Sequence, residues 1–295
     1  MEEDTAPPVL LSADLLAQLT DVHCHLTDSP ESLGLVGSPS VATGTMALMG
    51  TRLDDWSAVL ATRTAHPTRV LGGFGIHPWY APRTLASESS AGAPVTEHAW
   101  YTQLEALLIA HPWAFVGEIG MDKAAIDPNT KAVYDWDQQL TVFDAQWVLA
   151  IKYRRPVSMH VVHAQGWILR FMRDQSALCK TVPKCEWDAL WPPQIMIHSF
   201  NGSHDLIKQL SDLKGIGRKL YFSFSTAING RSPKFAERIR AVPRDRVLME
   251  SDTHTADRVD AAMSEVLTFA ASALELSVEE TAALTADNSA RMYSL

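Results

Sequence analysis

The chain has 295 residues, of which 46% are hydrophobic and 20% are charged. This composition is that of a globular protein and excludes disordered and collagen-like chains. The formal net charge is −9, so the chain lacks the broad basic surface of proteins that coat nucleic acid without sequence preference. Any phosphate-binding site must therefore be local.

The sequence also favours an intracellular location. Its first residues are acidic where a secretory signal needs positive charge, and no apolar stretch approaches the roughly 18 residues of a membrane span. Its three cysteines, Cys24, Cys179 and Cys185, are odd in number and too few for a disulfide framework. We expect a cytoplasmic protein without a membrane partner, with entry into the nucleus left open.

Eight short β-rich runs alternate with stretches of helical spacing, which is typical of βα units on a parallel sheet. The predicted strands are residues 19–25, 45–49, 70–76, 115–119, 157–160, 195–198, 220–225 and 247–250. Eight such units close a barrel. The sequence therefore predicts an α/β fold of the TIM type, a (β/α)8 barrel, as a single domain over residues 1–295 with a core from about 19 to 293.

Apolar stripes with helical spacing follow the fourth and eighth strands and predict helices that cover the barrel. Their members are Leu140, Phe143, Trp147 and Ile151, and then Val259, Met263, Val266, Ala270 and Leu274. A capping box of Ser277 and Glu280 predicts a further short helix. Residues 27–44, 86–94 and 174–194 are rich in turn-forming residues and are interpreted as loops, the first and last as insertions. Only the insertion at 27–44 directly follows a strand and can reshape the active-site face.

Potential metal ligands stand at the ends of five predicted strands. They are His23 and His25 at the first strand, Glu118 at the fourth, His160 at the fifth, His198 at the sixth and Asp252 at the eighth. His23 and His25 project to the same side because strand side chains alternate. The carboxyl ends of barrel strands carry the chemistry of the fold. The sequence therefore predicts a divalent metal site there.

The order of these motifs resembles the TatD metal-dependent hydrolases, a TatD-type deoxyribonuclease family of the amidohydrolase superfamily. The matching motifs are Asp21-Val-His-Cys-His25, Gly75-Ile-His-Pro78, Gly117-Glu-Ile-Gly-Met-Asp122, Pro156-Val-Ser-Met-His160, His198-Ser-Phe-Asn-Gly202 and Glu250-Ser-Asp252. The resemblance extends from Asp21 to Asn288 and to the ending Arg291-Met-Tyr293. It implies a TIM-type barrel, one or two divalent metal ions, and hydrolysis of DNA phosphodiesters by a deoxyribonuclease or 3′ to 5′ exonuclease.

The resemblance also implies a division of the ligands between two ions. It assigns His23, His25 and Asp252 to one ion, His160 and His198 to the second, and Glu118 to a bridging position. Imidazole and carboxylate ligands suit Mg, Mn or Zn. Glu118 and Asp252 are the expected catalytic residues, with Asp252 as the general base.

Three further residues are candidates for contacts with the substrate. The resemblance implies that His77 lies near the scissile phosphate. Asp122 is expected on the loop after the fourth strand, where it holds a ligand histidine or a substrate group. Where many TatD proteins have an arginine, this chain has Val162, and where a proline often follows the terminal aspartate it has His254. His163 or Lys123 is the candidate replacement for the missing positive charge.

Alternatives remain open for the substrate. The expected partner is a DNA end or another phosphodiester, held weakly because the chain is acidic. Trp79 and Tyr80 can stack bases, although two neighbouring aromatic residues are more often hydrophobic cover. The same barrel can instead act as an esterase or deacylase on a small metabolite or an aminoacylated RNA. A third alternative is a non-catalytic barrel whose loop insertions bind a protein partner.

Overall fold

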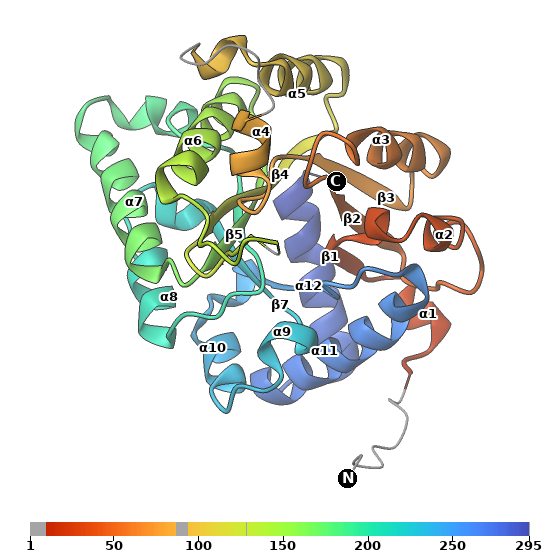
Figure 1. Cartoon of the computed structure of the whole chain (residues 1–295). Coiled ribbons are helices and arrows are strands. Elements are labelled where there is room, and N and C mark those ends of the chain that lie inside the picture. Colours follow the sequence, from red (N-terminus) through yellow and green to blue (C-terminus); the bar gives the residue numbers. More distant parts are fainter. Residues whose placement is uncertain (1–9, 87–93, 128, 295) are drawn as a thin grey trace.

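The computed structural model describes residues 10–86, 94–127 and 129–294, in which eight parallel strands follow one another in the order β1 to β8 (Figure 1). The strands are β1 (Thr20–Cys24), β2 (Thr45–Met49), β3 (Val70–Phe74), β4 (Phe115–Asp122), β5 (Val157–Val162), β6 (Ile195–Ile197), β7 (Leu220–Phe224) and β8 (Val247–Met249). All eight predicted strands are confirmed. Asp252 N donates to His23 O (3.1 Å) and His25 N to Thr253 O (2.8 Å), so the last strand meets the first. The TIM-type barrel is confirmed.

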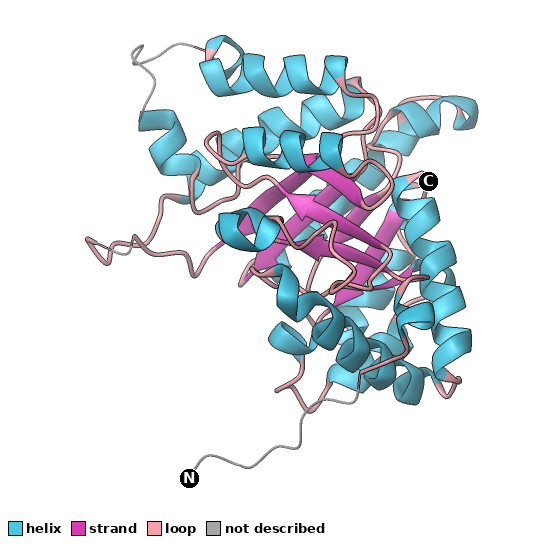
Figure 2. Cartoon of the chain, turned by 90° about the vertical axis from the view of Figure 1, so that its right-hand side faces the viewer, coloured by secondary structure: helices cyan, strands magenta, loops and turns pink. Residues whose placement is uncertain are grey.

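Helices surround the sheet, as Figure 2 shows from the side. The α-helices are α1 (Ala13–Leu16), α2 (Pro30–Leu33), α3 (Trp56–Ala65), α4 (Ala81–Ala86), α5 (Ala99–Ala110), α6 (Trp136–Lys152), α7 (Gln165–Ala177), α8 (His204–Ser211), α9 (Thr226–Asn229), α10 (Phe235–Ala241), α11 (Val259–Leu274) and α12 (Val278–Tyr293). The 3₁₀ helices are η1 (Leu26–Asp28), η2 (Val95–Glu97), η3 (Leu178–Lys180), η4 (Lys184–Ala189), η5 (Ile216–Lys219), η6 (Arg244–Arg246) and η7 (Ala256–Arg258). The apolar stripes predicted after strands four and eight lie on α6 and α11.

Alternation along the strands divides the buried residues into two layers. In β7, Leu220, Phe222 and Phe224 belong to the large apolar cluster shared with the helices. Tyr221 belongs instead to a separate small cluster, and the Ser223 hydroxyl donates to buried Glu250 (2.5 Å). On the face of β7 that is turned away from the large apolar cluster, the side chains therefore change from apolar to polar toward the carboxyl end of the strand.

The last helix, α12, brings an aromatic side chain against the strands. Tyr293 packs against both small apolar clusters, and its hydroxyl donates to Val22 O (2.6 Å). The capping box at Ser277 and Glu280 is confirmed. The expectation of a short helix is wrong, because α12 has 16 residues. Polar residues such as Asn288 are buried on its inner face and interrupt the apolar stripe.

The insertions contain more regular structure than the loop interpretation allowed. The segment at 27–44 includes α2, and the segment at 174–194 contains the end of α7 followed by η3 and η4. Trp191 is fully buried and its Nε1 donates to Gln175 O (3.2 Å), which ties the second insertion to α7. This insertion helps line a cavity of about 1020 Å³ at the amino-terminal ends of β6 and β7, away from the predicted site. The loop interpreted at 86–94 lies mostly outside the described residues.

Among the described residues, no single helix is long and apolar enough to cross a membrane. The segments Ala256–Leu274 and Val278–Tyr293 meet the length and composition test only as a pair bent by 104°. All three cysteines are free.

Close backbone contact between β4 and β5 requires glycine at position 120. Gly120 has φ +153°, and a Cβ there would overlap the carbonyl oxygen of His160. We predict that Gly120→Ala lowers the free energy of unfolding by about 1–3 kcal/mol, because the overlapping group is backbone. Gly166→Ala is the control, since a Cβ there meets nothing within 4 Å. Urea unfolding of both metal-free variants measures the difference, and equal stabilities would contradict the packing argument.

Candidate metal centre and active site

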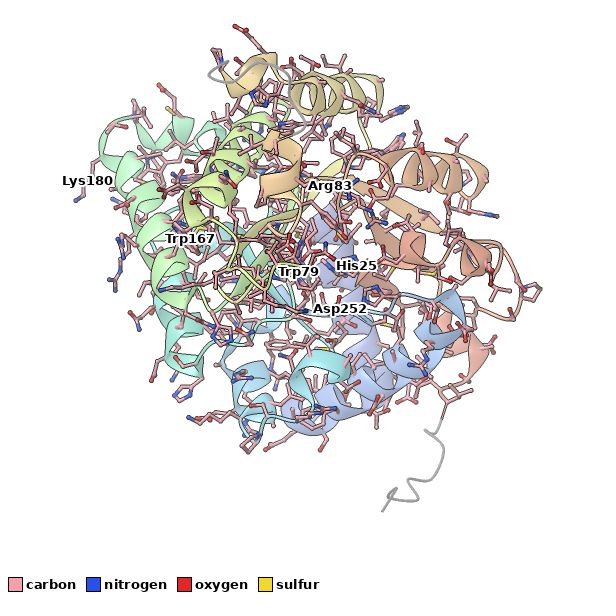
Figure 3. All side chains as sticks on the ribbon, viewed as in Figure 1. His25, Trp79, Arg83, Trp167, Lys180 and Asp252 are labelled. Atoms are coloured by element: carbon pink, nitrogen blue, oxygen red, sulfur yellow. The ribbon has the colours of Figure 1, made fainter. Side chains whose placement is uncertain are left out.

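The structure brings all six predicted ligands together at the carboxyl ends of the strands. Figure 3 places His25 and Asp252 at the centre of the barrel face, with Trp79 beside them. His23, Glu118 and His160 lie on β1, β4 and β5, and His25, His198 and Asp252 follow β1, β6 and β8 by one to three residues. The residues at the strand ends thus converge, as parallel strands in a closed barrel require.

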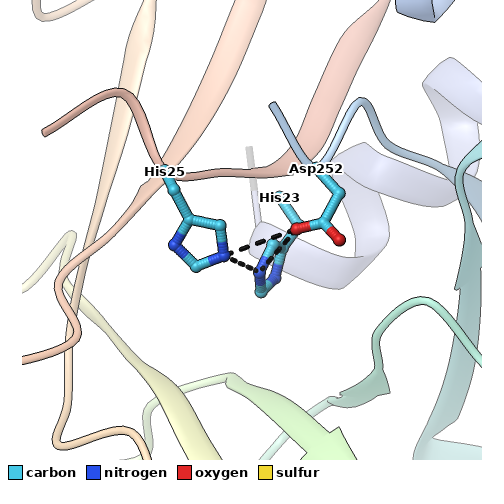
Figure 4. Close-up of side chains that lie close together, drawn as sticks. All are labelled: His23, His25 and Asp252. Carbon is cyan, nitrogen blue, oxygen red and sulfur yellow. Dashed lines mark hydrogen bonds and ion pairs between the residues drawn. The ribbon is translucent and has the colours of Figure 1, made fainter. Parts of the chain in front are cut away.

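His23, His25 and Asp252 form the first cluster, which Figure 4 shows in close-up. The Nε2 atoms of the two histidines are 3.1 Å apart. Asp252 Oδ1 lies 3.8 Å from His23 Nε2 and 3.4 Å from His25 Nε2. Three potential ligand atoms therefore face a common point.

Glu118 joins this cluster to the other two histidines. Its Oε1 lies 2.7 Å from both His160 Nδ1 and His198 Nε2. Its Oε2 lies 3.6 Å from His23 Nε2 and 3.4 Å from His25 Nε2. One carboxylate thus presents an oxygen to each side of the site.

The donor set fits divalent metal ions on two observations. Glu118 is 1% exposed, and its buried Oε2 atom has no hydrogen-bond partner among the described residues. His160 Nδ1 and His198 Nε2 are only 3.1 Å apart, a spacing that two lone pairs tolerate only with a proton or a cation between them. Buried imidazole and carboxylate groups arranged in this way match the ligands of Zn and similar ions.

Three of the histidines have a polar neighbour at the nitrogen that faces away from the cluster. His23 Nδ1 lies 2.9 Å from Ser158 Oγ. His160 Nε2 lies 3.4 Å from Asp122 Oδ2, and His198 Nδ1 lies 3.5 Å from Glu250 Oε1. Protons on these outer nitrogens leave the inner nitrogens free as ligands. The Asp122 carboxylate can only accept, so it favours the tautomer of His160 that metal binding needs, whereas the Ser158 hydroxyl can donate or accept.

His77 also lies in the site, in a cluster with Glu118 and His160. Its Nε2 is 3.5 Å from Glu118 Oε1. Its Nδ1 accepts the N–H of Trp79 (3.2 Å), so the neutral ring carries its proton on Nε2. Burial lowers the pKa of His77 well below its usual value and keeps the ring neutral. In this tautomer His77 is a donor toward the centre and not a metal ligand.

Asp122 is the last residue of β4, and not a loop residue as the sequence suggested. Its Oδ2 accepts the indole N–H of Trp79 (2.6 Å), and its Oδ1 accepts the N–H of Ala124 (2.8 Å). The side chain is thereby held against His160. Trp79 is 50% exposed, so the interpretation as hydrophobic cover is wrong for this residue. Its indole is tied to the edge of the site instead.

Two buried carboxylates without a role predicted from the sequence support the site. Glu250 accepts hydrogen bonds from Ser199 N (2.7 Å) and from the hydroxyls of Ser199 and Ser223 (2.5 Å each). Asp21 accepts from Ser251 N (2.9 Å), and burial raises its pKa to about 7. Both residues belong to the motifs quoted above. Their serine partners come mostly from other strands, so only the folded structure brings them together.

The pKa shifts in the cluster arise because two carboxylates, those of Glu118 and Asp252, lie among several imidazoles. Burial alone would raise the pKa of Glu118, but His77, His198 and His23 outweigh it and lower that pKa well below its usual range. The pKa of Asp252 is lowered for the same reason, mainly by His25 and His198. Burial acts against protonation of His25, but Asp252 and Glu118 raise its pKa to about 9. Both carboxylates are therefore ionised at neutral pH.

The backbone is strained at three strand ends beside the site. His163, Ser199 and Asp252 have φ values of 51°, 39° and 52°. Left-handed backbone at residues other than glycine costs on the order of 1 kcal/mol or more, and such residues gather at functional sites. They follow β5, β6 and β8, where the side chains enter the site.

The residues that depart from the family pattern lie near the rim. His254 stacks on His25 with ring centroids 5.2 Å apart and pairs with Asp28 (2.8 Å). Arg52 contacts the other oxygen of Asp28 (3.0 Å). Val162 is paired with Asp122 across β4 and β5. The exposed side chain of His163 lies with Lys123 in a pocket next to these strands and not in the metal cluster.

Metal binding is expected to depend on pH through His25. A metal ion needs the neutral imidazole, so it must displace the proton that His25 holds below about pH 9. We predict that the affinity for Mn²⁺ rises at least about tenfold per pH unit from pH 7 to about pH 9, because the pKa of His198 is raised as well, by Glu118 and Glu250. Calorimetry in buffers of different ionisation enthalpy measures the released proton. An affinity that stays constant between pH 7 and 9 would contradict the protonation of His25.

Comparisons with known proteins agree with the geometry. Residues 20–294 match the family model described as TatD related DNase. The chain is 28% identical to Cut9-interacting protein scn1 of Schizosaccharomyces pombe, over 93% of this chain and 98% of that protein. It is 26% identical to the 3'-5' ssDNA/RNA exonuclease TatD of Edwardsiella piscicida, over 70% and 66% of the two chains.

The fold also matches a solved structure. The TatD homologue YJJV from Escherichia coli K12 superposes with a TM-score of 0.69 at 18% identity, over 95% of this chain and 99% of that one. This similarity supports the barrel, and the family match covers nearly all of it. The chain belongs to the TatD-related DNase family, whose members are nucleases that hydrolyse ester bonds.

Proposed function

We propose that this protein is a metal-dependent deoxyribonuclease that removes nucleotides from the 3′ end of a strand. The observation that carries the proposal is Glu118, a buried carboxylate that presents one oxygen to His160 and His198 and the other to His23 and His25. Such an arrangement can hold two divalent ions close together. The relative from Edwardsiella piscicida, named a 3'-5' ssDNA/RNA exonuclease, supports the class of substrate and the direction.

The proposed ligand roles follow the observed clusters. His23, His25 and Asp252, which form one cluster, would hold one ion. His160 and His198, whose inner nitrogens lie 3.1 Å apart, would hold the other, with Glu118 between the two ions. Ions of the Mg, Mn or Zn type would supply an activated water and neutralise the charge of the phosphate. Nothing in this donor set selects among the three metals.

The remaining steps belong to the side chains. Asp252 Oδ1 faces the two imidazoles of the first cluster, so we assign its Oδ2 to accept the proton of the attacking water. His77 Nε2 donates a hydrogen bond to a phosphate oxygen and stabilises the charge that develops there. Asp122 and Glu250 keep His160 and His198 in the required tautomers.

Removing either central carboxylate is expected to abolish turnover. We predict that Glu118→Gln and Asp252→Asn lower kcat on end-labelled single-stranded DNA by at least about 10²-fold. Asp287→Asn, an exposed carboxylate on α12, is the matched control and should retain activity. Labels at the 5′ and 3′ ends report the direction of digestion. Wild-type levels of cleavage in both central variants would exclude the proposed mechanism.

The assignment of His77 makes a separate prediction. Because its Nε2 is a donor and not a ligand, His77→Ala should keep the full metal content while kcat falls about 10²-fold. Metal analysis of the variant after dialysis, together with its kinetics, tests this. Loss of one bound ion would show that His77 is a metal ligand.

A protein-binding role is the second candidate, and one observation favours it. The relative from Schizosaccharomyces pombe is named as an interaction protein. The partner would bind at the insertions 27–44 and 174–194. A barrel used only for binding has no need of a complete ligand set, whereas this chain brings all six ligands together. Absence of metal-restored hydrolysis from protein that still binds two ions would favour the binding role, or an ester or amide substrate.

A further inference from the structure

A second pocket lies at the carboxyl ends of β4 and β5, the end of the barrel that carries the metal site. It has a volume of about 490 Å³, and we call it the side pocket. The residues that matter here are Lys123, Tyr134, Trp136, His163, Trp167 and Arg170. Figure 3 shows Trp167 on the same face of the barrel as Trp79 and His25. None of its lining residues is a carboxylate, although the chain as a whole has a net charge of −9.

The side pocket lies next to the proposed catalytic residues along the backbone of two strands. Lys123 directly follows Asp122, and His163 directly follows Val162. These neighbours are paired across β4 and β5, and Lys123 N donates to Val162 O (3.0 Å). Asp122 in turn lies 3.4 Å from His160. One residue step therefore separates the pocket from a side chain that contacts a proposed metal ligand.

The positive groups of the side pocket are free to bind an anion. The side chains of Lys123, His163 and Arg170 have no hydrogen bond or ion pair with any described residue. Arg52, by contrast, is engaged by Asp28 (3.0 Å) and Asp54 (3.3 Å). Two permanent cations and an imidazole around one pocket attract phosphate oxygens.

The aromatic side chains provide a surface for a flat ring. Trp167 is held by Phe171 (5.4 Å between centroids) and by the edge of Trp136 (6.1 Å). The Tyr134 ring has no ring contact with the described residues. Nearby, Val133 is 66% exposed and pairs with Ile126, which is 50% exposed. Half-buried aromatic groups and exposed apolar groups beside unpaired cations are the features that bind bases and phosphates of single strands.

We propose that the side pocket binds a nucleotide of a single-stranded nucleic acid, on the 5′ side of the scissile phosphate. Its base stacks on Tyr134 and its phosphate contacts Lys123 and Arg170. This inference rests on the proposed nuclease function and names how the substrate strand is held. It also identifies cationic side chains that supply positive charge where the family arginine is replaced by Val162.

Binding measured without turnover tests the side pocket. Fluorescein-labelled hexanucleotides of DNA and of RNA are titrated with the full chain in EDTA, and anisotropy gives the affinity. Arg170→Glu should weaken binding about tenfold, and Tyr134→Ala about fivefold, with Tyr134→Phe restoring it. Lys180→Glu makes the same charge change at an exposed residue on the outer edge of the molecule (Figure 3) and should stay within twofold.

The salt dependence adds a second readout. Loss of one phosphate contact in Arg170→Ala should reduce the slope of log affinity against log salt by about 0.7. Equal losses of affinity for DNA and RNA would show that the pocket contacts the base and the phosphate, which both nucleic acids share. Loss on RNA alone would assign the pocket to RNA. Circular dichroism of each variant confirms that it is folded.

Two results would overturn the proposal: equal affinities for the wild type and Arg170→Glu, or no binding of either hexanucleotide by the wild type. The nuclease function is tested separately by the wild-type protein loaded with Mn²⁺ on bis(p-nitrophenyl) phosphate. Hydrolysis of this small diester with no effect of Arg170→Glu on strand binding refutes the side pocket alone. No hydrolysis of any phosphodiester refutes the function, whatever the anisotropy shows.

Discussion

The buried carboxylate of Glu118 is the group on which the site depends. A carboxylate that is 1% exposed has lost its hydration, and an unpaired buried charge is costly unless other charges or metal ions compensate it. Four histidines from β1, β5 and β6 surround Glu118. The outer nitrogens of three of them lie close to Ser158, Asp122 and Glu250. The barrel is the frame that brings these strands to one carboxylate.

Much of this arrangement could be predicted because it is local in the sequence. The strands have a period of two, and their polar ends hold His23, His160 and His198 in recognisable motifs. Side chains at the carboxyl ends of barrel strands must converge, so the cluster followed from the fold class.

Other features depend on contacts between distant segments. The carboxylate of Glu250 accepts hydrogen bonds from the hydroxyls of Ser199 and Ser223. No local sequence pattern predicts these contacts. The tautomer of His77 depends on a hydrogen bond from Trp79. Buried polar residues interrupt the apolar pattern of α12, so that pattern did not show how long the helix is. The side pocket combines residues from the β4–α6 and β5–α7 segments. Among these residues, the sequence pattern indicated a function only for Lys123 and His163.

The central claim is that Glu118 lies between two bound divalent ions. A crystal of the protein soaked in Mn²⁺ and measured near the manganese absorption edge tests it directly. Two anomalous peaks are expected, one beside His23, His25 and Asp252 and the other beside His160 and His198, with an oxygen of Glu118 at each. Absence of peaks from this site, or ions bound without Glu118 as a ligand, would show that Glu118 does not join two metal ions.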